Sequence, residues 1–175
     1  MSRTTTQAPE RDRSWEDVAR GAADAFDAGT DDEQAELLRE LLVFGLDDGA
    51  YAIPVERVRE IVRYRELTAV PRSPEWMLGV MALRGEVVEV VDLRRRLGLR
   101  GGEIDRWTRI IVLHGGADRV TGVLVDSVAE VHRAPEDCML PAQGSDLSAV
   151  VDICRRGEEF ISVLDADVAV GFQDG

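Results

Sequence analysis

The chain has 175 residues, with 21 basic against 34 acidic side chains and a formal net charge of −13. This length suits one domain, or one domain with a tail, and a chain of this size buries roughly 70% of its unfolded surface. The acidic balance argues against nucleic acids and anionic membranes as partners, because both need a basic face. All the basic side chains are arginines, which excludes phosphate loops and Schiff-base sites that depend on lysine.

The first 40 residues differ from the rest, being rich in Ala, Asp and Glu. The chain opens on a polar stretch without the apolar core of a signal peptide, and its apolar runs are far shorter than the ~20 residues that span a bilayer. We therefore expect a cytoplasmic protein. Within this extension Trp15, Val18, Ala22 and Phe26 recur at helical spacing. The pattern fits either a short amphipathic helix or an acidic tail that orders only on contact.

Short strands are predicted from Leu41 onward. Residues 41–46 and 51–54 flank an Asp-Asp-Gly turn, which is hairpin spacing. Pro54 then opens a stretch whose apolar residues recur at helical spacing, which predicts a helix of two turns. These apolar residues are Val55, Val58, Ile61 and Val62.

The unit of two strands, a turn and a short helix recurs twice more. Residues 77–84 and 86–91 flank Gly85, and Asp92 begins a helical turn that stops at Gly98. The remaining predicted elements are a hairpin of residues 150–156 and 160–164, a helix from Asp165, a strand pair of residues 109–114 and 119–125, and its continuation in residues 128–131.

Eight to ten short strands with glycine-rich turns predict a mainly β fold of small barrels or a sandwich, because edge strands must be closed or covered. A parallel α/β sheet is not expected, since the connections are too short for full crossover helices.

The sequence carries few options for catalysis. It lacks the nucleophile-elbow, dinucleotide, zinc-protease and phosphate-loop motifs. A zinc site or a Cys–His nucleophile could be built only from scattered residues, namely His114, His132, Cys138 and Cys154. We expect the two cysteines to be small core residues rather than a disulfide. No catalytic residue, metal or cofactor is predicted.

Three other features call for explanation. Gly79 lies inside a predicted strand, where glycine marks a bulge or a close backbone approach. Arg84 lies at the tip of an apolar hairpin, where it is either a surface residue beside the turn or a contact residue for another protein. The run Arg94-Arg95-Arg96 is interpreted as the solvated face of a short helix rather than an anion site.

Five segments, in this order and spacing, resemble the CheW family of chemotaxis coupling proteins. They are Leu42-Val43-Phe44, residues 51–61, residues 79–85, residues 90–94 and residues 121–128. The resemblance runs from about residue 41 to residue 170, so residues 1–40 are an extension and residues 171–175 a tail. It implies two intertwined five-stranded SH3-like β-barrels around a shared core.

The resemblance also implies a non-enzymatic adaptor. Such proteins join the cytoplasmic tip of a methyl-accepting chemoreceptor to the regulatory domain of a CheA-type histidine kinase, in membrane-associated arrays. Carried over by motif position, the receptor-binding residues are Val58, Glu60, Ile61, Gly79 and Arg84. For the kinase we expect contacts from Leu67, Val70, Glu86 and Val88.

The chain departs from the family pattern at two positions, with Ala82 in place of the usual Asn and Glu89 in place of the usual Pro. Two other classes of function stay open. One is an isolated CheW-like binding module that serves a divergent motility or other output without the ordinary receptor. The other is a hydrolase or metal protein built on the cysteines and histidines, against which the missing motifs count.

Overall fold

The computed structural model describes residues 37–144 and 148–171. All of them belong to one of the two units into which the chain divides, Asp31–Gly175. The predicted helix around Trp15 and the end of the predicted tail lie outside the described residues. The domain boundaries therefore stay predictions, although strand β1 already begins at Leu38.

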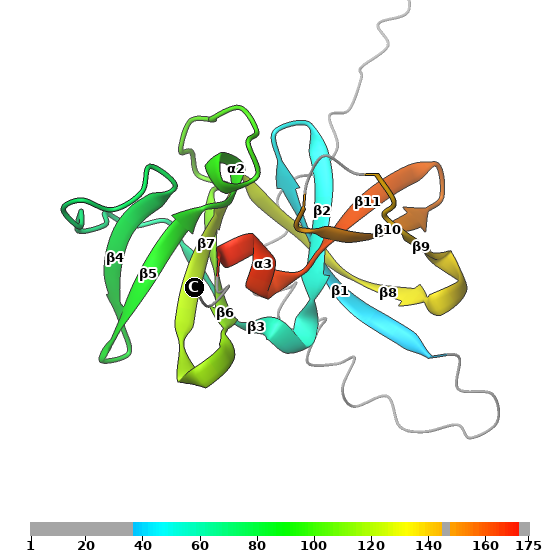
Figure 1. Cartoon of the computed structure of the whole chain (residues 1–175), viewed down its shortest axis with the longest axis horizontal. Helices are drawn as coiled ribbons and strands as arrows, with labels where there is room; N and C mark the ends of the chain where they lie inside the picture. Colours follow the sequence, from blue (N-terminus) through cyan, green and yellow to red (C-terminus); the bar gives the residue numbers. More distant parts are fainter. Residues whose placement is uncertain (1–36, 145–147, 172–175) are drawn as a thin grey trace, which may run out of the picture. The chain divides into compact units, whose positions relative to one another are not determined.

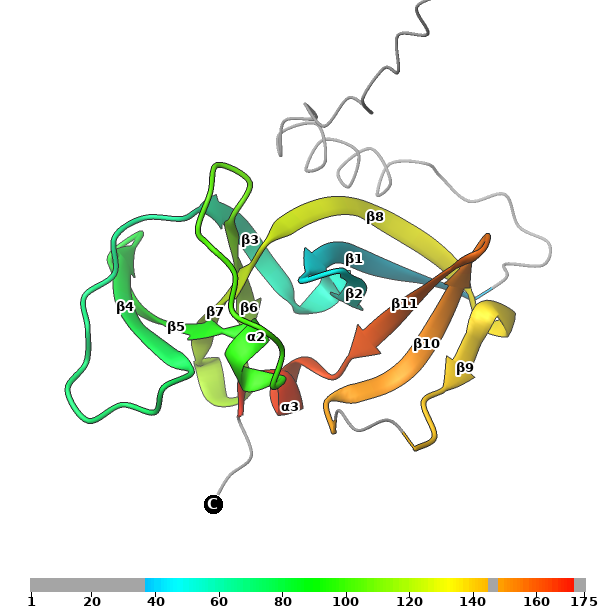
Figure 2. The same cartoon turned by 90° about the horizontal axis from the view of Figure 1, so that it is seen from above.

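The described residues form two β-sheets, which Figures 1 and 2 show side by side. Sheet A has the strand order β8-β1-β2-β11-β10-β9, and sheet B has the order β3-β6-β7-β5-β4. The strands of sheet A are β1 (Leu38–Leu46), β2 (Gly49–Pro54), β8 (Ser127–Pro135), β9 (Met139–Pro141), β10 (Val150–Arg156) and β11 (Glu159–Leu164). Those of sheet B are β3 (Val58–Arg63), β4 (Met77–Leu83), β5 (Glu86–Asp92), β6 (Arg109–His114) and β7 (Val120–Val125).

The chain crosses between the sheets twice. Strands β1 and β2 begin sheet A, β3 to β7 build sheet B, and β8 to β11 return to sheet A. One parallel pair in each sheet, β2 with β11 and β5 with β7, joins strands that do not follow each other in the sequence. The predicted mainly β fold of two intertwined halves is confirmed. Sheet B has the predicted five strands, whereas the three-residue β9 brings sheet A to six.

Tight turns close the predicted hairpins. Arg84 and Gly85 both have positive φ, +50° and +82°, which is the type I′ geometry that matches the twist of the flanking strands. Leu83 pairs with Glu86 across them, so the turn between β4 and β5 is two residues long. Between β10 and β11 the turn uses Gly157, with φ +60°.

The predicted helix after Pro54 is wrong. The chain makes a single 3₁₀ turn, η1 (Val55–Arg57), and continues directly as strand β3. A β-bulge between Val58 and Glu60 inserts an extra residue, so that Val58 and Ile61 pack against the same core. This spacing of three residues on one face imitates the period of a helix.

The other predicted helices are present and short. Helix α2 (Leu93–Arg96) begins at Asp92 and helix α3 (Ala166–Val170) at Asp165, and each carboxylate accepts two backbone N–H groups of the first turn. This capping offsets the missing hydrogen bonds at a helix start. Two further 3₁₀ turns are η2 (Gly116–Asp118) and η3 (Glu136–Cys138).

Three apolar cores result from this arrangement. One lies within sheet A, around Leu41, Val43 and Ile161, and one within sheet B, around Val88, Val90 and Ile110. The third and largest takes residues from both sheets and both helices, and it matches the predicted shared core. Its buried members include Leu42, Phe44, Ile53, Leu93, Ile111, Leu113, Val123, Leu164 and Val170.

Candidate partner-binding surface

Strands β3 and β4 are the two ends of sheet B, and side chains rather than a ladder connect them. The segment after β3 makes one isolated backbone bridge to β4, between Thr68 and Val80, with both hydrogen bonds formed at 2.8 and 2.9 Å. Two ion pairs then join β3 to the β4–β5 hairpin, one to the turn residue Arg84 and one to Glu86, the first residue of β5. Their four residues, Arg59, Glu60, Arg84 and Glu86, are called the surface clasp below.

Arg84 and Glu60 form the better-aligned pair of the surface clasp. The Arg84 Nε donates to Glu60 Oε1 at 3.1 Å, and its Nη2 donates to Oε2 at 3.3 Å, a forked arrangement. The Arg84 side chain is 71% exposed and that of Glu60 19%. An exposed pair of this kind contributes about 0.2–1 kcal/mol, so a carboxylate from another protein can compete with Glu60 for Arg84.

The second pair of the surface clasp lies beside the first. Arg59 Nη1 donates to Glu86 Oε2 at 2.5 Å, and the Glu86 side chain is half exposed. Glu86 was predicted to contact the kinase and Glu60 and Arg84 to contact the receptor. The structure brings these three residues together in one cluster.

The other predicted receptor residues lie around this cluster rather than in it. Val58 and Ile61 are partly buried against the shared core, on the opposite side of β3 from Glu60. Gly79 is buried at the predicted bulge, with φ +146°. A Cβ atom there would lie 2.3 Å from the backbone oxygen of Thr68, so the predicted close backbone approach is confirmed.

Among the predicted kinase residues, Val88 cannot contact the kinase through its side chain, because that side chain is fully buried in the sheet B core. Its neighbour Val87 is 73% exposed. Strand alternation was the available signal, since Val88 and Val90 share the inward side and Val87 the outward side. Leu67 packs partly against the same core, and Val70 is half-buried, with its carbonyl accepting from Ser73 Oγ.

A second Arg–carboxylate group is buried where the chain crosses from sheet B to sheet A. Arg94 is 3% exposed. Its Nε lies 3.5 Å from Asp92 Oδ1, and its Nη1 lies 2.9 Å from Asp126 Oδ1, out of line for a hydrogen bond. Asp92, Arg94 and Asp126 are called the buried cluster below. The interpretation of Arg94 as part of a solvated helix face is therefore wrong.

The buried cluster fixes several segments at once. Asp126 Oδ2 accepts the backbone N–H of Asp47 in the β1–β2 turn at 2.7 Å, and the Asp126 N–H donates to the Gly45 carbonyl at 3.1 Å. The loop before β6 approaches so closely that a Cβ on Gly102 would lie 2.1 Å from Arg94 Nη1. Sequence reasoning missed this group, whose members are joined only by the fold.

The remaining arginines of α2 hold the segment before β4. Arg95 Nη1 donates to the Glu75 carbonyl at 3.0 Å, and the Arg96 guanidinium lies over the Trp76 ring, 5.3 Å from its centroid. These contacts connect the shared core to the loop that leads to Gly79.

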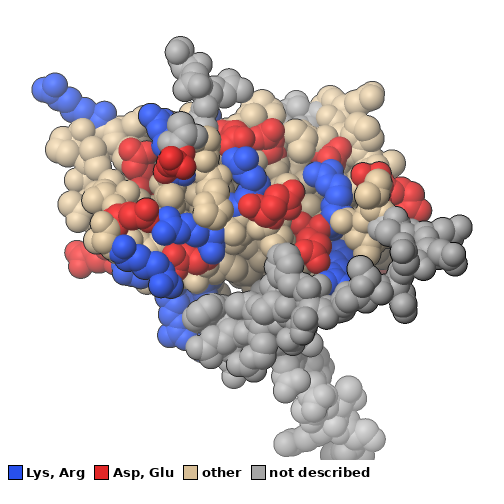
Figure 3. All heavy atoms as spheres, turned by 90° about the horizontal axis from the view of Figure 1, so that it is seen from below, with Lys and Arg blue, Asp and Glu red and all other residues tan. Residues whose placement is uncertain are grey.

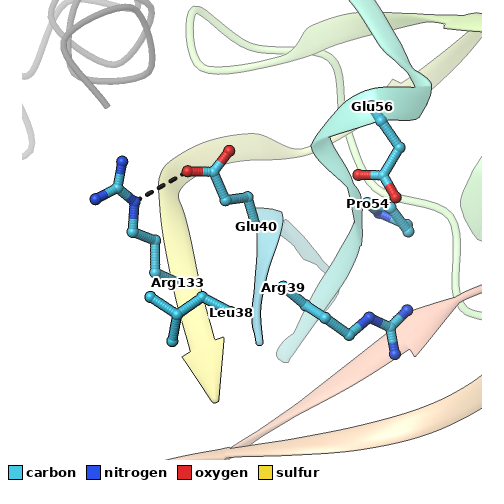
Figure 4. A pocket seen from close by; sticks show the side chains of 6 residues that line it. All are labelled: Leu38, Arg39, Glu40, Pro54, Glu56 and Arg133. Carbon is cyan, nitrogen blue, oxygen red and sulfur yellow. Dashed lines mark hydrogen bonds and ion pairs between the residues drawn. The ribbon is translucent and has the colours of Figure 1, made fainter. Parts of the chain in front are cut away.

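A groove of about 340 Å³ opens on sheet A, between the start of β1 and the end of β2. Figure 4 shows Glu40 and Arg133 pointing toward each other across adjacent strands, joined by a 2.9 Å ion pair, while Arg39 points away from them. Glu56 reaches the groove from η1. Among the described residues on the face seen in Figure 3, blue and red side chains intermingle, so these residues offer no single-sign patch for a polyanion.

Neither a metal site nor a membrane span is found in the described part of the chain. Within it, no group of three or more His, Cys, Asp or Glu side chains could hold a metal ion. None of its helices is long and apolar enough to cross a bilayer.

Residues 40–171 match the family model described as a CheW-like domain. The chain is similar to a probable chemotaxis protein CheW of Rhizobium etli, at 34% identity over 103 residues, which are 59% of this chain and 66% of that protein. It is also similar to protein FrzA of Myxococcus xanthus, at 37% identity over 117 residues, 66% and 72% of the two chains.

Among solved structures, the chain is similar to the scaffolding protein TtCheW from Thermoanaerobacter tengcongensis. The TM-score is 0.71 at 26% identity, over 75% of this chain and 92% of that one. The chain spans slightly less than two thirds of the length of three CheW relatives, 66% in Rhizobium etli, 62% in Klebsiella aerogenes and 64% in Helicobacter pylori.

Proposed function

The chain belongs to the CheW-like domain family, and on that premise we propose that it is a non-enzymatic adaptor of bacterial signal transduction. It joins the cytoplasmic tip of a methyl-accepting chemoreceptor to the regulatory domain of a CheA-type histidine kinase. The names of its relatives, chemotaxis protein CheW and a scaffolding protein, support this role. The adaptor acts in the cytoplasm, at membrane-associated chemoreceptor arrays.

The main support for receptor binding is the exposed position of the Arg84 side chain. Arg84 lies in a two-residue turn with positive φ at both positions, at the end of the β4–β5 hairpin, and its side chain is 71% exposed. A guanidinium fork of this kind suits a carboxylate on an amphipathic helical hairpin. On binding, the receptor carboxylate replaces Glu60 as the partner of Arg84.

The main support for kinase binding is the exposed apolar surface on the outward side of the β4–β5 hairpin. Val87 is 73% exposed and Ala82, its partner in the ladder, is exposed as well. A protein contact has an apolar centre and a polar rim, and here the exposed Val87 and Ala82 supply apolar surface with Glu86 and Glu89 beside it. We assign the kinase contact to Val87 and Glu86, with Leu67 and Val70 at its border.

Titration calorimetry tests the two halves separately. The full chain is titrated with a receptor cytoplasmic fragment and with the kinase regulatory domain of the same organism. Arg84→Asn removes the guanidinium but keeps the turn, because Asn-Gly is favoured in type I′ geometry. We expect it to weaken receptor binding by roughly tenfold or more, and to leave kinase binding unchanged.

A matched control is Arg119→Asn, which removes another exposed arginine, at the β6–β7 connection. It should leave both affinities unchanged. Saturable binding to both partners, with only Arg84→Asn reducing the receptor affinity, supports the adaptor. The absence of heat with either partner, from folded protein, would replace it with the binding module of a divergent output.

A further inference from the structure

Helices α2 and α3 contact each other at the shared core (Figure 2). A cavity of about 220 Å³ opens between the end of α2, the residues just before β10, and α3. Its lining includes Arg96, Gly98, Ser148 and Ala169, and among the described residues that line it Arg96 alone is charged. The cavity thus joins an element that follows β5 of sheet B to one that follows β11 of sheet A.

Arg96 differs from its neighbours on α2 because it lacks a carboxylate partner. The Nε atoms of Arg94 and Arg95 lie 3.5 and 3.4 Å from the Asp92 carboxylate. Within the described part of the chain Arg96 has no such ion pair, and its Nε is buried without a hydrogen-bond partner. A buried donor on a charged group is costly when it has no acceptor, so this guanidinium is suited to an anion from outside the chain.

The acidic residues of α3 already have partners of their own. The Asp165 carboxylate accepts two backbone N–H groups of the first turn, and Asp167 forms an ion pair with Arg57. The helix beside the cavity therefore does not supply Arg96 with a carboxylate.

The Arg96 guanidinium is held in place, and one of its edges is open. One face of the group lies over the Trp76 ring, 5.3 Å from the centroid, which fixes its plane. At Gly171 an added Cβ atom would lie 3.2 Å from Arg96 Nη2 and 3.5 Å from Nε. Gly171 has the left-handed backbone, φ +78°, that ends α3, so this glycine caps the helix and leaves the Nε–Nη2 edge uncovered by a side chain.

We propose that this cavity, called the α2–α3 pocket below, binds a small free oxyanion, a carboxylate or a phosphate, at the Nε–Nη2 edge of Arg96. That edge presents two parallel N–H groups, the arrangement that holds carboxylate and phosphate oxygens in a bidentate manner. Ser148, also in the lining, supplies a hydroxyl as a further donor. Because Trp76 already orients the guanidinium, little ordering is left to be done on binding.

The size of the α2–α3 pocket limits the ligand. A volume of 220 Å³ corresponds to about seven water molecules at about 30 Å³ each. It is smaller than the roughly 300–1,000 Å³ of pockets for drug-sized ligands. Inorganic phosphate or a short dicarboxylate fits it. The bound anion contacts α2 and α3 together, so it stabilises the junction of the two halves of the domain.

Nuclear magnetic resonance of the isotope-labelled full chain tests the proposal. The protein is titrated with phosphate, succinate or chloride at constant pH and ionic strength. We expect saturable shifts of the Gly98, Ser148 and Gly171 amides and of the Arg96 Nε–H with an oxyanion but not with chloride. A response to phosphate alone identifies a phosphoryl ligand, and a response to succinate identifies a carboxylate. At ten times its Kd the ligand should raise Tm by roughly 3–5 °C.

Two substitutions of Arg96 separate charge from geometry. Arg96→Lys keeps the charge but loses the planar fork, and it should raise the Kd by roughly tenfold. Arg96→Gln should abolish saturable binding. The matched control is Arg100→Gln, which removes an exposed arginine from the loop after α2 and should leave the Kd unchanged.

A steric variant tests the open edge. Gly171→Ala should weaken binding, because its Cβ narrows the space beside Nη2 and Nε. Gly157→Ala is the matched control, since Gly157 also has a positive φ, +60°, but nothing lies within 4 Å of the added Cβ.

The proposal is overturned if neither oxyanion gives saturable shifts, if chloride gives the same shifts, or if the Kd is unchanged in both Arg96 variants. The titrations contain neither receptor nor kinase, so their result is independent of the adaptor role.

Discussion

The surface clasp and the buried cluster use the same chemistry, arginine against carboxylate, at two depths. Arg84 in the surface clasp is 71% exposed, whereas Arg94 in the buried cluster is 3% exposed. Water and salt weaken the first interaction, whereas Arg94 and Asp92 in the second are 3% and 5% exposed and are shielded from both. The buried arginine is thus committed to the fold, and the exposed arginine is available to a partner.

The backbone positions of Arg84 and Arg94 differ as their exposure does. Arg84 occupies a turn at the end of a hairpin, where its backbone is left-handed and its side chain is 71% exposed. Arg94 follows the capping residue Asp92, on a helix held between the two sheets. The comparison predicts that substitutions separate into those that unfold the protein and those that change only binding.

The largest loss of stability is expected from Arg94→Met. The substitution keeps much of the side-chain volume but removes the buried arginine from both Asp92 and Asp126. It leaves Asp92, with a side chain 5% exposed, only the exposed Arg95 as an arginine partner, Nε to Oδ2 at 3.4 Å. Removing one partner of a buried pair costs about 3–5 kcal/mol. Urea unfolding followed by circular dichroism measures it.

The matched control for Arg94→Met is Arg95→Met on the same helix, because the Arg95 side chain is 54% exposed. It should cost less than about 1 kcal/mol. Equal losses in the two variants would contradict the distinction between the buried cluster and the surface.

A smaller loss, about 2–4 kcal/mol, is expected from Gly79→Ala. Its backbone has φ +146°, and the new Cβ would meet the Thr68 oxygen at 2.3 Å, so strain and a clash act together. Thermal unfolding checks it against Gly85→Ala, where φ is +82° and nothing lies within 4 Å of the added Cβ. The control should lose only about 1 kcal/mol, and a Gly79→Ala protein as stable as wild type would argue against the close packing of Thr68.

Val88 and Val87, neighbours on β5, allow the same comparison of a buried with an exposed residue within one strand. Val88→Ala should cost about 2 kcal/mol through the lost buried methyl groups and the cavity. Val87→Ala should change stability by less than about 0.5 kcal/mol and weaken kinase binding instead. Chemical denaturation and calorimetry on both variants separate the two effects, and a kinase-binding loss confined to Val88→Ala would contradict the assignment.

The smallest change in stability is expected from Arg84→Asn, within about 0.5 kcal/mol of wild type, because an exposed ion pair is lost and a favoured turn residue gained. A double-mutant cycle with Glu60→Gln should give a coupling energy of about 0.2–1 kcal/mol. A coupling of several kcal/mol would show that the surface clasp is structural rather than available.

Local signals explain what the sequence could predict. Gly85 and Gly157 marked their hairpins because a turn needs positive φ at a fixed place, and Asp92 and Asp165 marked helix starts by capping. The prediction of a helix after Pro54 was wrong because a 3₁₀ turn followed by a β-bulge gives the apolar residues the same spacing as a helix.

The missing parts of the candidate site are long-range. Glu60 and Arg84 are 24 residues apart in the sequence, and only the curvature of sheet B brings them together. The burial of Arg94 depends on Asp126 and on the loop at Gly102, neither of which is near it in the sequence. A run of three arginines carries no local sign of which member is buried.

Bridging is the central claim, and co-sedimentation of three components tests it most directly. A receptor fragment on vesicles is pelleted with the soluble regulatory domain of the kinase, with and without this protein. We predict that the regulatory domain enters the pellet only when the protein is present, and that Arg84→Asn, but not Arg119→Asn, prevents it. Pelleting of the regulatory domain without the protein, or its failure to pellet when folded wild-type protein is present, would contradict the account.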